Sequence, residues 1–250
     1  MYTLEHLMNL IIDIGNTVAK LAVFEKEKLI LLQRKNANDL ERSVSEILPR
    51  FPKIEQIFVA SVAAFDSSHF SKIFSSHRLL FLNLKSKLPF KNLYQTPETL
   101  GPDRLALVAA AVCKYPKHNV LIIDTGTCIT YDFIDDKSNY YGGAISPGIQ
   151  MRYKALYENT DRLPLLEPTI PSHIVGDTTQ RAIHSGVVFG VVNEIEGVVA
   201  SYKSKYSDLT VILTGGDANF LCKQFKISIF AVSNFLLEGL NFLLEYNSNK

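Results

Sequence analysis

Two short segments of the chain share one pattern, in which a run of apolar residues ends at an acid and a glycine-containing turn follows. They span residues 10–17 and 120–127. An uninterrupted apolar run is typical of a strand buried on both faces of a sheet, so the pattern predicts strands that end at Asp13 and at Asp124. Burying a lone carboxylate is costly because it loses its hydration. A turn with an acid and a glycine suits phosphate oxygens and the cation that neutralises them. One Asp-Gly turn is common between strands, but two such segments indicate duplicated halves that face one nucleotide.

The first half of the chain then alternates between strand and helix patterns. Strands are predicted over residues 20–24, 29–33, 56–62 and 79–82, and helices over residues 39–48 and 67–74. The first strands form an antiparallel meander, and later strands alternate with helices, which is typical of an α/β fold with a mixed sheet. The segment 85–99 is polar and broken by Pro89 and Pro97, so we expect a loop there.

The second half repeats this plan. Strands are predicted over residues 120–124, 130–134, 210–214 and 227–232, and helices over residues 150–157, 178–202 and 234–246. The paired glycines and the Pro-Gly of residues 140–148 predict a loop whose backbone passes close to another group. The helix over 178–202 carries so many apolar residues that it is either a central core helix or part of a subunit contact.

A helix is also predicted to begin at the segment Gly101-Pro102-Asp103-Arg104. Pro102 suits a first turn, where its missing N–H is no loss, and Asp103 complements the helix dipole there. These structural roles are one interpretation. The other is that both charged residues stand at the mouth of a site, where Arg104 binds a substrate oxygen and Asp103 accepts a hydroxyl proton.

Composition and charge narrow the function classes. The chain has 250 residues, 47% of them hydrophobic, and a formal net charge of +1. This balance gives no reason to expect binding to nucleic acid or to an anionic membrane. Three cysteines without a Cys-x-x-Cys pair argue against a disulfide framework and a zinc site. No apolar run reaches the roughly 18 residues of a membrane span. We therefore expect a cytoplasmic protein.

The motifs, taken in order over about residues 8–245, resemble those of the type III pantothenate kinases. These are bacterial members of the actin-like superfamily, which includes acetate and sugar kinases. The resemblance implies transfer of the γ-phosphoryl group of ATP to pantothenate, the first step of coenzyme A synthesis. It implies a duplicated α/β fold of ribonuclease H type, with lobes at residues 1–112 and 113–250, mixed sheets, and an ATP cleft between the lobes. It also implies a homodimer.

The resemblance assigns roles to individual residues as well. Asp103 becomes the proton acceptor, Asp13 a magnesium ligand that acts through water, and Asp124 the ligand of a monovalent cation, potassium or ammonium. The residues implied to bind ATP are Asp13, Gly15, Asn16, Thr17, Lys20, Thr127, Gly215 and Gly216. Those implied to bind pantothenate are Tyr94, Gly101, Pro102, Asp103, Arg104 and Thr179.

Two other functions remain open at this point. A different actin-like kinase, for a sugar or small alcohol, would keep both phosphate turns but need another acceptor pocket. A catalytically silent ATP-binding regulator or filament-forming relative would share the fold. The presence of Asp13, Asp124, Asp103 and Arg104 together argues against a silent protein, which has no need of all four.

Overall fold

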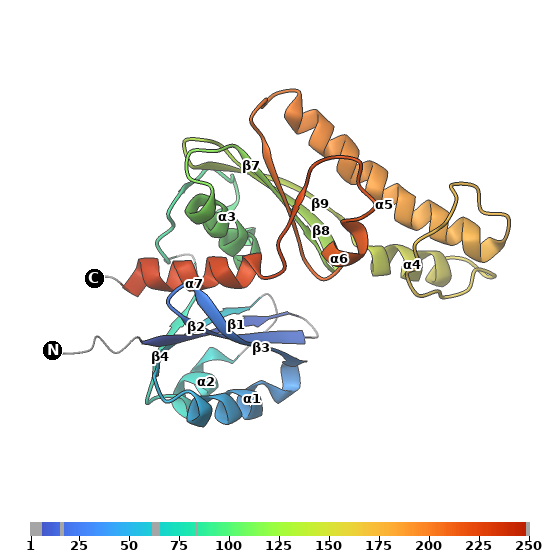
Figure 1. Ribbon diagram of the computed structural model, residues 1–250. Helices are drawn as coiled ribbons and strands as arrows, with labels where there is room; N and C mark the ends of the chain where they lie inside the picture. Colours follow the sequence, from blue (N-terminus) through green and yellow to red (C-terminus); the bar gives the residue numbers. More distant parts are fainter. Residues whose placement is uncertain (1–6, 16–17, 62–65, 84, 249–250) are drawn as a thin grey trace. The chain divides into compact units, whose positions relative to one another are not determined.

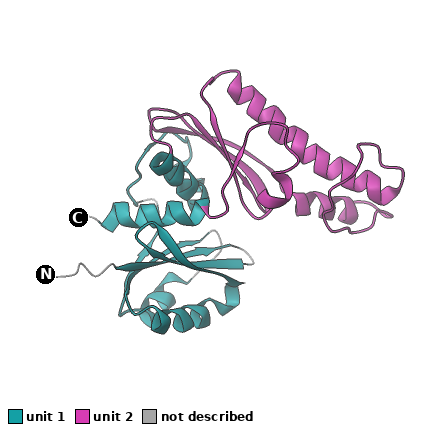
Figure 2. Cartoon of the chain, viewed as in Figure 1, with its two compact units in different colours: residues 1–114, 235–250 teal, residues 115–234 magenta. Residues whose placement is uncertain are grey.

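The chain is organised as two compact units (Figure 2). Unit 1 comprises Met1–Lys114 and Phe235–Lys250, and unit 2 comprises Tyr115–Asn234. The computed structural model describes residues 7–15, 18–61, 66–83 and 85–248. Each unit is built on one mixed sheet, so the predicted α/β class is confirmed.

The sheet of unit 1 is centred on β1, whose residues are almost all buried. The strands are β1 (Met8–Ile14), β2 (Val18–Glu25), β3 (Lys28–Asn36), β4 (Ile54–Ser61) and β5 (Arg78–Phe81), in the order β3-β2-β1-β4-β5. The meander β1-β2-β3 is antiparallel, as predicted, and β4 and β5 extend the sheet in parallel. A central strand of this kind is covered on both faces, which explains the unbroken apolar run before Asp13.

Helices cover both faces of this sheet (Figure 1). On one face lie α1 (Leu40–Ile47) and α2 (Ser67–Ile73), which share a core with alternate residues of β1. The helices α3 (Pro102–Lys114) and α7 (Phe235–Ser248) pack on each other and on the other face. The segment predicted as a loop, residues 85–99, contains the two-residue strand β6 (Lys91–Asn92) and a 3-10 turn.

The last helix belongs to unit 1, although the predicted lobe 113–250 included it. Helix α7 lies so close to α3 that a Cβ on Gly239 would be 1.9 Å from the carbonyl oxygen of Ala106. Its buried leucines also pack towards β1 and β4, which explains why the chain returns to unit 1 at its end. The lobe boundary at residue 112 stays a prediction.

Unit 2 repeats the strand plan of unit 1. Its strands are β7 (Val120–Thr125), β8 (Cys128–Ile134), β9 (Asn139–Pro147), β10 (Thr210–Thr214) and β11 (Phe230–Ala231). Their order is β11-β10-β7-β8-β9, with β7-β8-β9 antiparallel and β10 and β11 parallel to β7. The position of β7 thus matches that of β1, and the duplication predicted from the two acid-ended strands is confirmed.

The prediction of a loop over residues 140–148 is wrong for most of that segment. Residues Asn139–Pro147 form β9, which pairs with β8 along its length. The glycines are needed because two backbones approach closely: a Cβ on Gly143 would lie 1.8 Å from the carbonyl oxygen of Tyr131, and Gly142 has a φ of 94°. The backbone does pass close to another group, as expected, but that group is the neighbouring strand.

Three helices accompany the sheet of unit 2. They are α4 (Ile149–Glu158), α5 (Thr179–Lys203) and the short α6 (Ala218–Leu221). All three contribute to one apolar core with residues of β7, β8 and β10. Eight of the 25 residues of α5 are buried, so one face of the helix belongs to this core, and its part in a subunit contact stays a prediction.

Among the residues that the structure describes, α5 alone is long and apolar enough to cross a membrane. Its most apolar 18-residue window has a mean hydropathy of 1.3, and 44% of that window is buried within the structure. A single helix of this kind is a weak indication of a membrane span, because the core helix of a soluble protein has the same composition.

Candidate active site

The turn after β1 places an acid and a lysine in direct contact. Asp13 and Lys20 are partners in the antiparallel pairing of β1 with β2. Lys20 Nζ donates a hydrogen bond to Asp13 Oδ2 at 3.0 Å, and the Asp13 side chain is 11% exposed. Gly15 N–H donates to the Val18 carbonyl at 3.1 Å and closes the turn. The predicted ATP-binding residues Asn16 and Thr17 lie outside the described residues.

The start of α3 in unit 1 holds the second predicted acid. Pro102 is its first residue, as expected, and Asp103 Oδ1 accepts a hydrogen bond from the Arg104 N–H at 2.9 Å. The carboxylate folds over Gly101, where a Cβ would lie 2.3 Å from Asp103 Oδ1. Burial raises the pKa of Asp103, and the nearby Asp13 carboxylate adds to the rise. Within unit 1, Asp13 and Asp103 are therefore close enough for their carboxylates to interact electrostatically.

Arg104 and Tyr94 form the next part of this site. Arg104 is 6% exposed. Its guanidinium carbon lies 5.4 Å from the centroid of the Tyr94 ring, which is within the range of a cation–π contact. The Tyr94 N–H donates to Asn92 Oδ1 at 3.0 Å, which fixes the backbone that carries the ring. The sequence predicted both residues for pantothenate binding, and the structure brings them together.

In unit 2, the turn after β7 lies against the Gly-Gly turn after β10. Thr214 is the parallel partner of Asp124. Gly215 has a φ of +100°, and a Cβ there would lie 2.3 Å from both Asp124 Oδ1 and the Thr125 carbonyl oxygen. Thr125 Oγ1 donates to the Thr214 carbonyl at 2.9 Å. Around Gly216, by contrast, nothing lies within 4 Å of an added Cβ. The structure therefore joins two motifs that are about 90 residues apart in the sequence.

The exposed Thr127 is contacted from a third segment. Gly148 N–H donates to the Thr127 carbonyl at 3.1 Å. A Cβ on Gly148 would lie 2.2 Å from the Gly126 carbonyl oxygen and 2.4 Å from that of Thr127. Only glycine fits this contact, so the Pro-Gly at the end of β9 supports the predicted phosphate turn directly.

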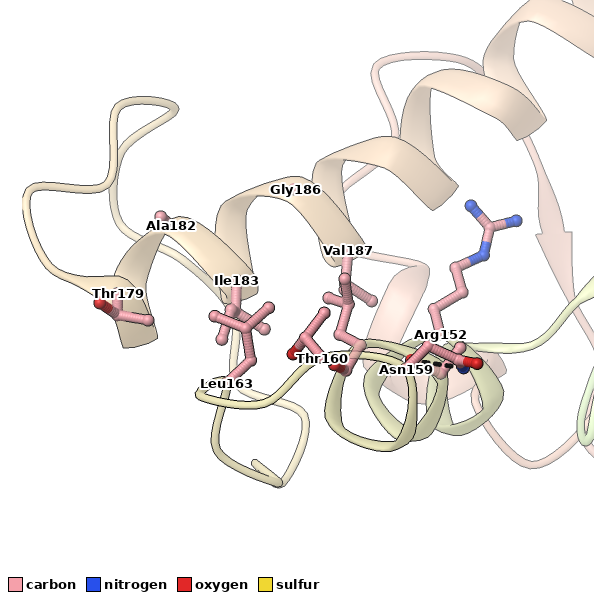
Figure 3. Close-up of a pocket in the computed structure, with 11 residues that line it drawn as sticks. Arg152, Asn159, Thr160, Leu163, Thr179, Ala182, Ile183, Gly186 and Val187 are labelled. Carbon is pink, nitrogen blue, oxygen red and sulfur yellow. Dashed lines mark hydrogen bonds between the residues drawn. The ribbon is translucent and has the colours of Figure 1, made fainter.

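Thr179 belongs to another part of unit 2, where it is the first residue of α5. It lines an apolar pocket of about 880 Å³ between α4, the segment that follows α4, and the start of α5 (Figure 3). The helix is capped by Thr178, whose side chain accepts from the Arg181 N–H at 3.2 Å. The predicted substrate contact of Thr179 thus has a pocket beside it within unit 2.

Asp217 is a further acid in unit 2, and the sequence motifs did not predict it as a site residue. Its N–H donates to the Thr125 carbonyl at 2.9 Å, so it stands beside the turn that follows β7. Burial raises the pKa of its carboxyl group. The sequence does carry a signal for it, because a third acid follows a buried strand, but two glycines separate this acid from the end of the strand.

Solved structures show which class of fold this architecture belongs to. A Campylobacter jejuni protein assigned to the Baf family of transcriptional activators aligns with a TM-score of 0.65 at 24% identity, covering 96% of this chain and 100% of its own. A protein from Sinorhizobium meliloti, assigned as a 2-dehydro-3-deoxygalactonokinase, aligns with a TM-score of 0.61 at 12% identity, covering 97% of each chain. A glucokinase from an Antarctic psychrotroph gives 0.52 at 13%, covering 96% of this chain and 99% of its own. The predicted actin-like fold, shared with sugar kinases, is confirmed.

Sequence relatives define the family within that class. The family model for type III pantothenate kinase matches residues 9–201. Proteins named type III pantothenate kinase from Christiangramia forsetii and Flavobacterium johnsoniae are 49% and 47% identical to this chain. The alignments cover 97% and 96% of this chain and 100% and 98% of those relatives. The chain belongs to the type III pantothenate kinase family, and the resemblance found from its motifs is confirmed.

Proposed function

We propose that the chain phosphorylates the primary hydroxyl of pantothenate with ATP, which is the first step of coenzyme A synthesis. The observation that carries this proposal is the arrangement at the start of α3 in a member of this family. There Asp103 is half-buried beside Asp13, and Arg104 lies under the Tyr94 ring. Asp103 serves as proton acceptor, and Arg104 with Tyr94 binds the polar groups of pantothenate.

The raised pKa of Asp103, caused first by burial, suits a general base. A carboxylate with an ordinary low pKa is a weak base at neutral pH, and catalysis improves as the pKa of the base approaches the working pH. The Arg104 N–H holds Asp103 Oδ1, which leaves Oδ2 for the hydroxyl of the acceptor. Phosphoryl transfer needs alignment and charge neutralisation more than covalent help from the protein. Asp103 therefore acts mainly by orienting the hydroxyl and then taking its proton.

ATP binding is assigned to residues of both units. In each unit, these residues lie at or near the turns that follow the buried strands. In unit 1 these are Asp13, Gly15, Asn16, Thr17 and Lys20, with Asn16 and Thr17 outside the described residues. In unit 2, Thr127 contacts the phosphates, while the backbone at Gly215 and Gly216 lies beside the nucleoside. The close packing around Gly215 and the open space around Gly216 support the assignment of this backbone to the nucleoside.

Two ions complete the proposal. Magnesium in kinases is held by one or two carboxylates, waters and substrate phosphates, and the nearly buried Asp13 fits such a role. A potassium or ammonium ion is assigned to Asp124, because a carboxylate oxygen and the Thr125 carbonyl oxygen both lie against Gly215. These ions supply charge neutralisation for the phosphates. No group of three or more His, Cys, Asp or Glu side chains placed to hold a metal occurs in the described part of the chain.

We also propose a cytoplasmic homodimer. Unit 2 exposes apolar side chains near the start of α5, including Ile174 at 73% and Val175 at 78% exposure. Exposed apolar side chains that gather in one region are typical of protein contacts. Light scattering of the purified protein should give twice the chain mass of 28.0 kDa, and a monomer mass at micromolar concentration would contradict the dimer.

An acceptor screen with ATP consumption as the readout tests the activity. Pantothenate should stimulate consumption, whereas glucose, N-acetylmannosamine and glycerol should not. Stimulation by one of those sugars or by glycerol, with none by pantothenate, would favour another actin-like kinase. No acceptor-dependent consumption at all would favour a silent ATP-binding relative.

A further inference from the structure

Arg152 lies where three segments of unit 2 meet. It belongs to the first turns of α4, and its N–H donates to the Gly148 carbonyl at 3.1 Å. Its side chain turns back along the end of β9: Nε donates to the Pro147 carbonyl at 2.9 Å, and Nη2 donates to Ser146 Oγ at 2.9 Å. A single arginine thus holds three consecutive residues of the segment that enters α4.

Glu194 on α5 fixes the guanidinium of Arg152. The two side chains form an ion pair and are only 22% and 28% exposed. Tyr131 OH on β8 donates to the other carboxylate oxygen of Glu194 at 2.9 Å. Burial raises the pKa of Glu194, but hydrogen bonds from Arg152, Ser146 and Tyr131 outweigh it and keep that pKa below its ordinary value. Glu194 is therefore charged at neutral pH and holds the arginine in one orientation.

Figure 3 shows that the Arg152 guanidinium points away from the other labelled residues of the apolar pocket, including Thr179. The charged end instead serves the segment 146–148, whose last residue, Gly148, is in contact with the carbonyl groups of Gly126 and Thr127.

We propose that Arg152 is a positioning residue for the phosphate turn of unit 2, and that Glu194 orients it. The inference rests on the proposed function, which assigns Thr127 to ATP. The contacts form a continuous chain. Glu194 forms an ion pair with Arg152, and Arg152 donates to the Pro147 carbonyl and the Ser146 hydroxyl. The next residue, Gly148, packs closely against the carbonyl group of Thr127. An error of about 1 Å in the position of a substrate-binding group can cost on the order of 100-fold in rate, so this support matters for ATP.

The test compares Arg152→Ala, Arg152→Lys and Glu194→Gln with Lys154→Ala as the matched control. Lys154 is a cation on the same helix, but it is 66% exposed and pairs with Glu158 within α4. Direct ATP binding, measured by calorimetry without acceptor, and the KM values for ATP and pantothenate are the readouts. Thermal midpoints show which variants fold.

Arg152→Ala should weaken ATP binding and raise the KM for ATP by about tenfold or more. The KM for pantothenate should change by less, although Arg152 also lines the pocket beside Thr179. Arg152→Lys should recover part of the loss, because lysine keeps the charge but lacks the planar fork that spans several acceptors. Glu194→Gln should also raise the KM for ATP selectively, but by a smaller factor. Lys154→Ala should leave the KM for ATP unchanged.

A purely structural role would lower the thermal midpoint and leave the KM for ATP unchanged, which would overturn the inference. Equal changes in both KM values would also overturn it. If Arg152→Ala does not fold, Arg152→Lys and Glu194→Gln decide by the same criteria. If the wild type binds ATP but does not phosphorylate pantothenate, the proposed function fails, and the ATP-binding measurement still tests Arg152.

Discussion

Lys20 Nζ lies 3.0 Å from Asp13 Oδ2, between two residues that face each other across β1 and β2. The acid of this pair is largely shielded from solvent, since the Asp13 side chain is 11% exposed. The Lys20 side chain is 36% exposed. Lysine thus balances the charge that the end of β1 buries. Its partial exposure is compatible with the proposed contact to a phosphate oxygen of ATP.

Asp13→Ala should abolish turnover, because the magnesium-bound phosphates lose a charge partner in a reaction that depends on charge neutralisation. Turnover at saturating magnesium is the measurement. Glu27→Ala is the control, since it removes an exposed acid from the turn between β2 and β3 and should leave turnover unchanged. Near wild-type turnover in Asp13→Ala would contradict the role of this acid in phosphate binding.

Asp103→Asn should lower kcat on the order of 100-fold, while ATP binding is retained. Loss of a general base typically costs about 10² to 10⁴ in rate, and a loose transition state asks little of the base early in the reaction, so we expect the lower part of that range. The control is Asp66→Asn. Asp66 caps the start of α2, where its side chain accepts hydrogen bonds from the N–H groups of Ser68 and His69. A kcat within about threefold of wild type, far inside the general-base range, would reduce Asp103 to a helix-capping role.

The pH dependence of kcat follows from the same residue. Burial raises the pKa of Asp103, and the Asp13 carboxylate adds to the rise, so the base is protonated over a wider acidic range than an exposed aspartate. The rate should therefore rise with pH through the raised pKa and then level off. In Asp103→Asn this acidic limb should disappear. An unchanged limb in the variant would assign it to another group.

The same pKa shift predicts the effect of Asp103→Asn on stability. An acid whose pKa is higher in the folded state binds more protons there than in the unfolded state, so stability falls as pH rises from the unfolded pKa through the folded one. Asparagine removes the buried charge and can still accept from the Arg104 N–H. The thermal midpoint at pH 7 should equal or exceed that of wild type, and a clear decrease would show that the carboxylate stabilises the fold.

Activity should depend on a monovalent cation held at Asp124. In tetramethylammonium buffer the rate should be low, and potassium chloride at the same ionic strength should raise it. Asp124→Ala should be inactive or insensitive to potassium, because the carboxylate oxygen beside Gly215 is lost. The assignment would be wrong if wild type ignored potassium and Asp124→Ala matched it.

Gly215→Ala should destabilise unit 2, whereas Gly216→Ala should not. Alanine at Gly215 would have to adopt a φ of +100° and approach Asp124 Oδ1 and the Thr125 carbonyl oxygen to 2.3 Å, while Gly216 has open space around it. We expect Gly215→Ala to lower the free energy of unfolding by about 1–3 kcal/mol, measured by urea denaturation. Equal unfolding free energies for the two variants would show that the turn relaxes without cost.

Sequence patterns alone were sufficient to predict the strands that end in acids, the helix that begins at Pro102, the duplicated plan and the family. These features are local or depend on the order of motifs, because a buried strand reads as an apolar run and a phosphate turn needs its acid and glycine close together. The strand β9 was not predicted, because its glycines are typical of a loop. In the structure they are required by the close approach of the backbone to Tyr131.

The partners of the charged groups, by contrast, depend on how distant parts of the chain pack together. The raised pKa of Asp103 depends on burial and on Asp13, which is 90 residues away in the chain. The pairing of Arg152 with Glu194 joins α4 to α5, and α7 returns to unit 1 because Gly239 fits against Ala106. Burial and long-range contacts set these properties, and no local pattern of residue types encodes which distant group will lie within a few ångströms.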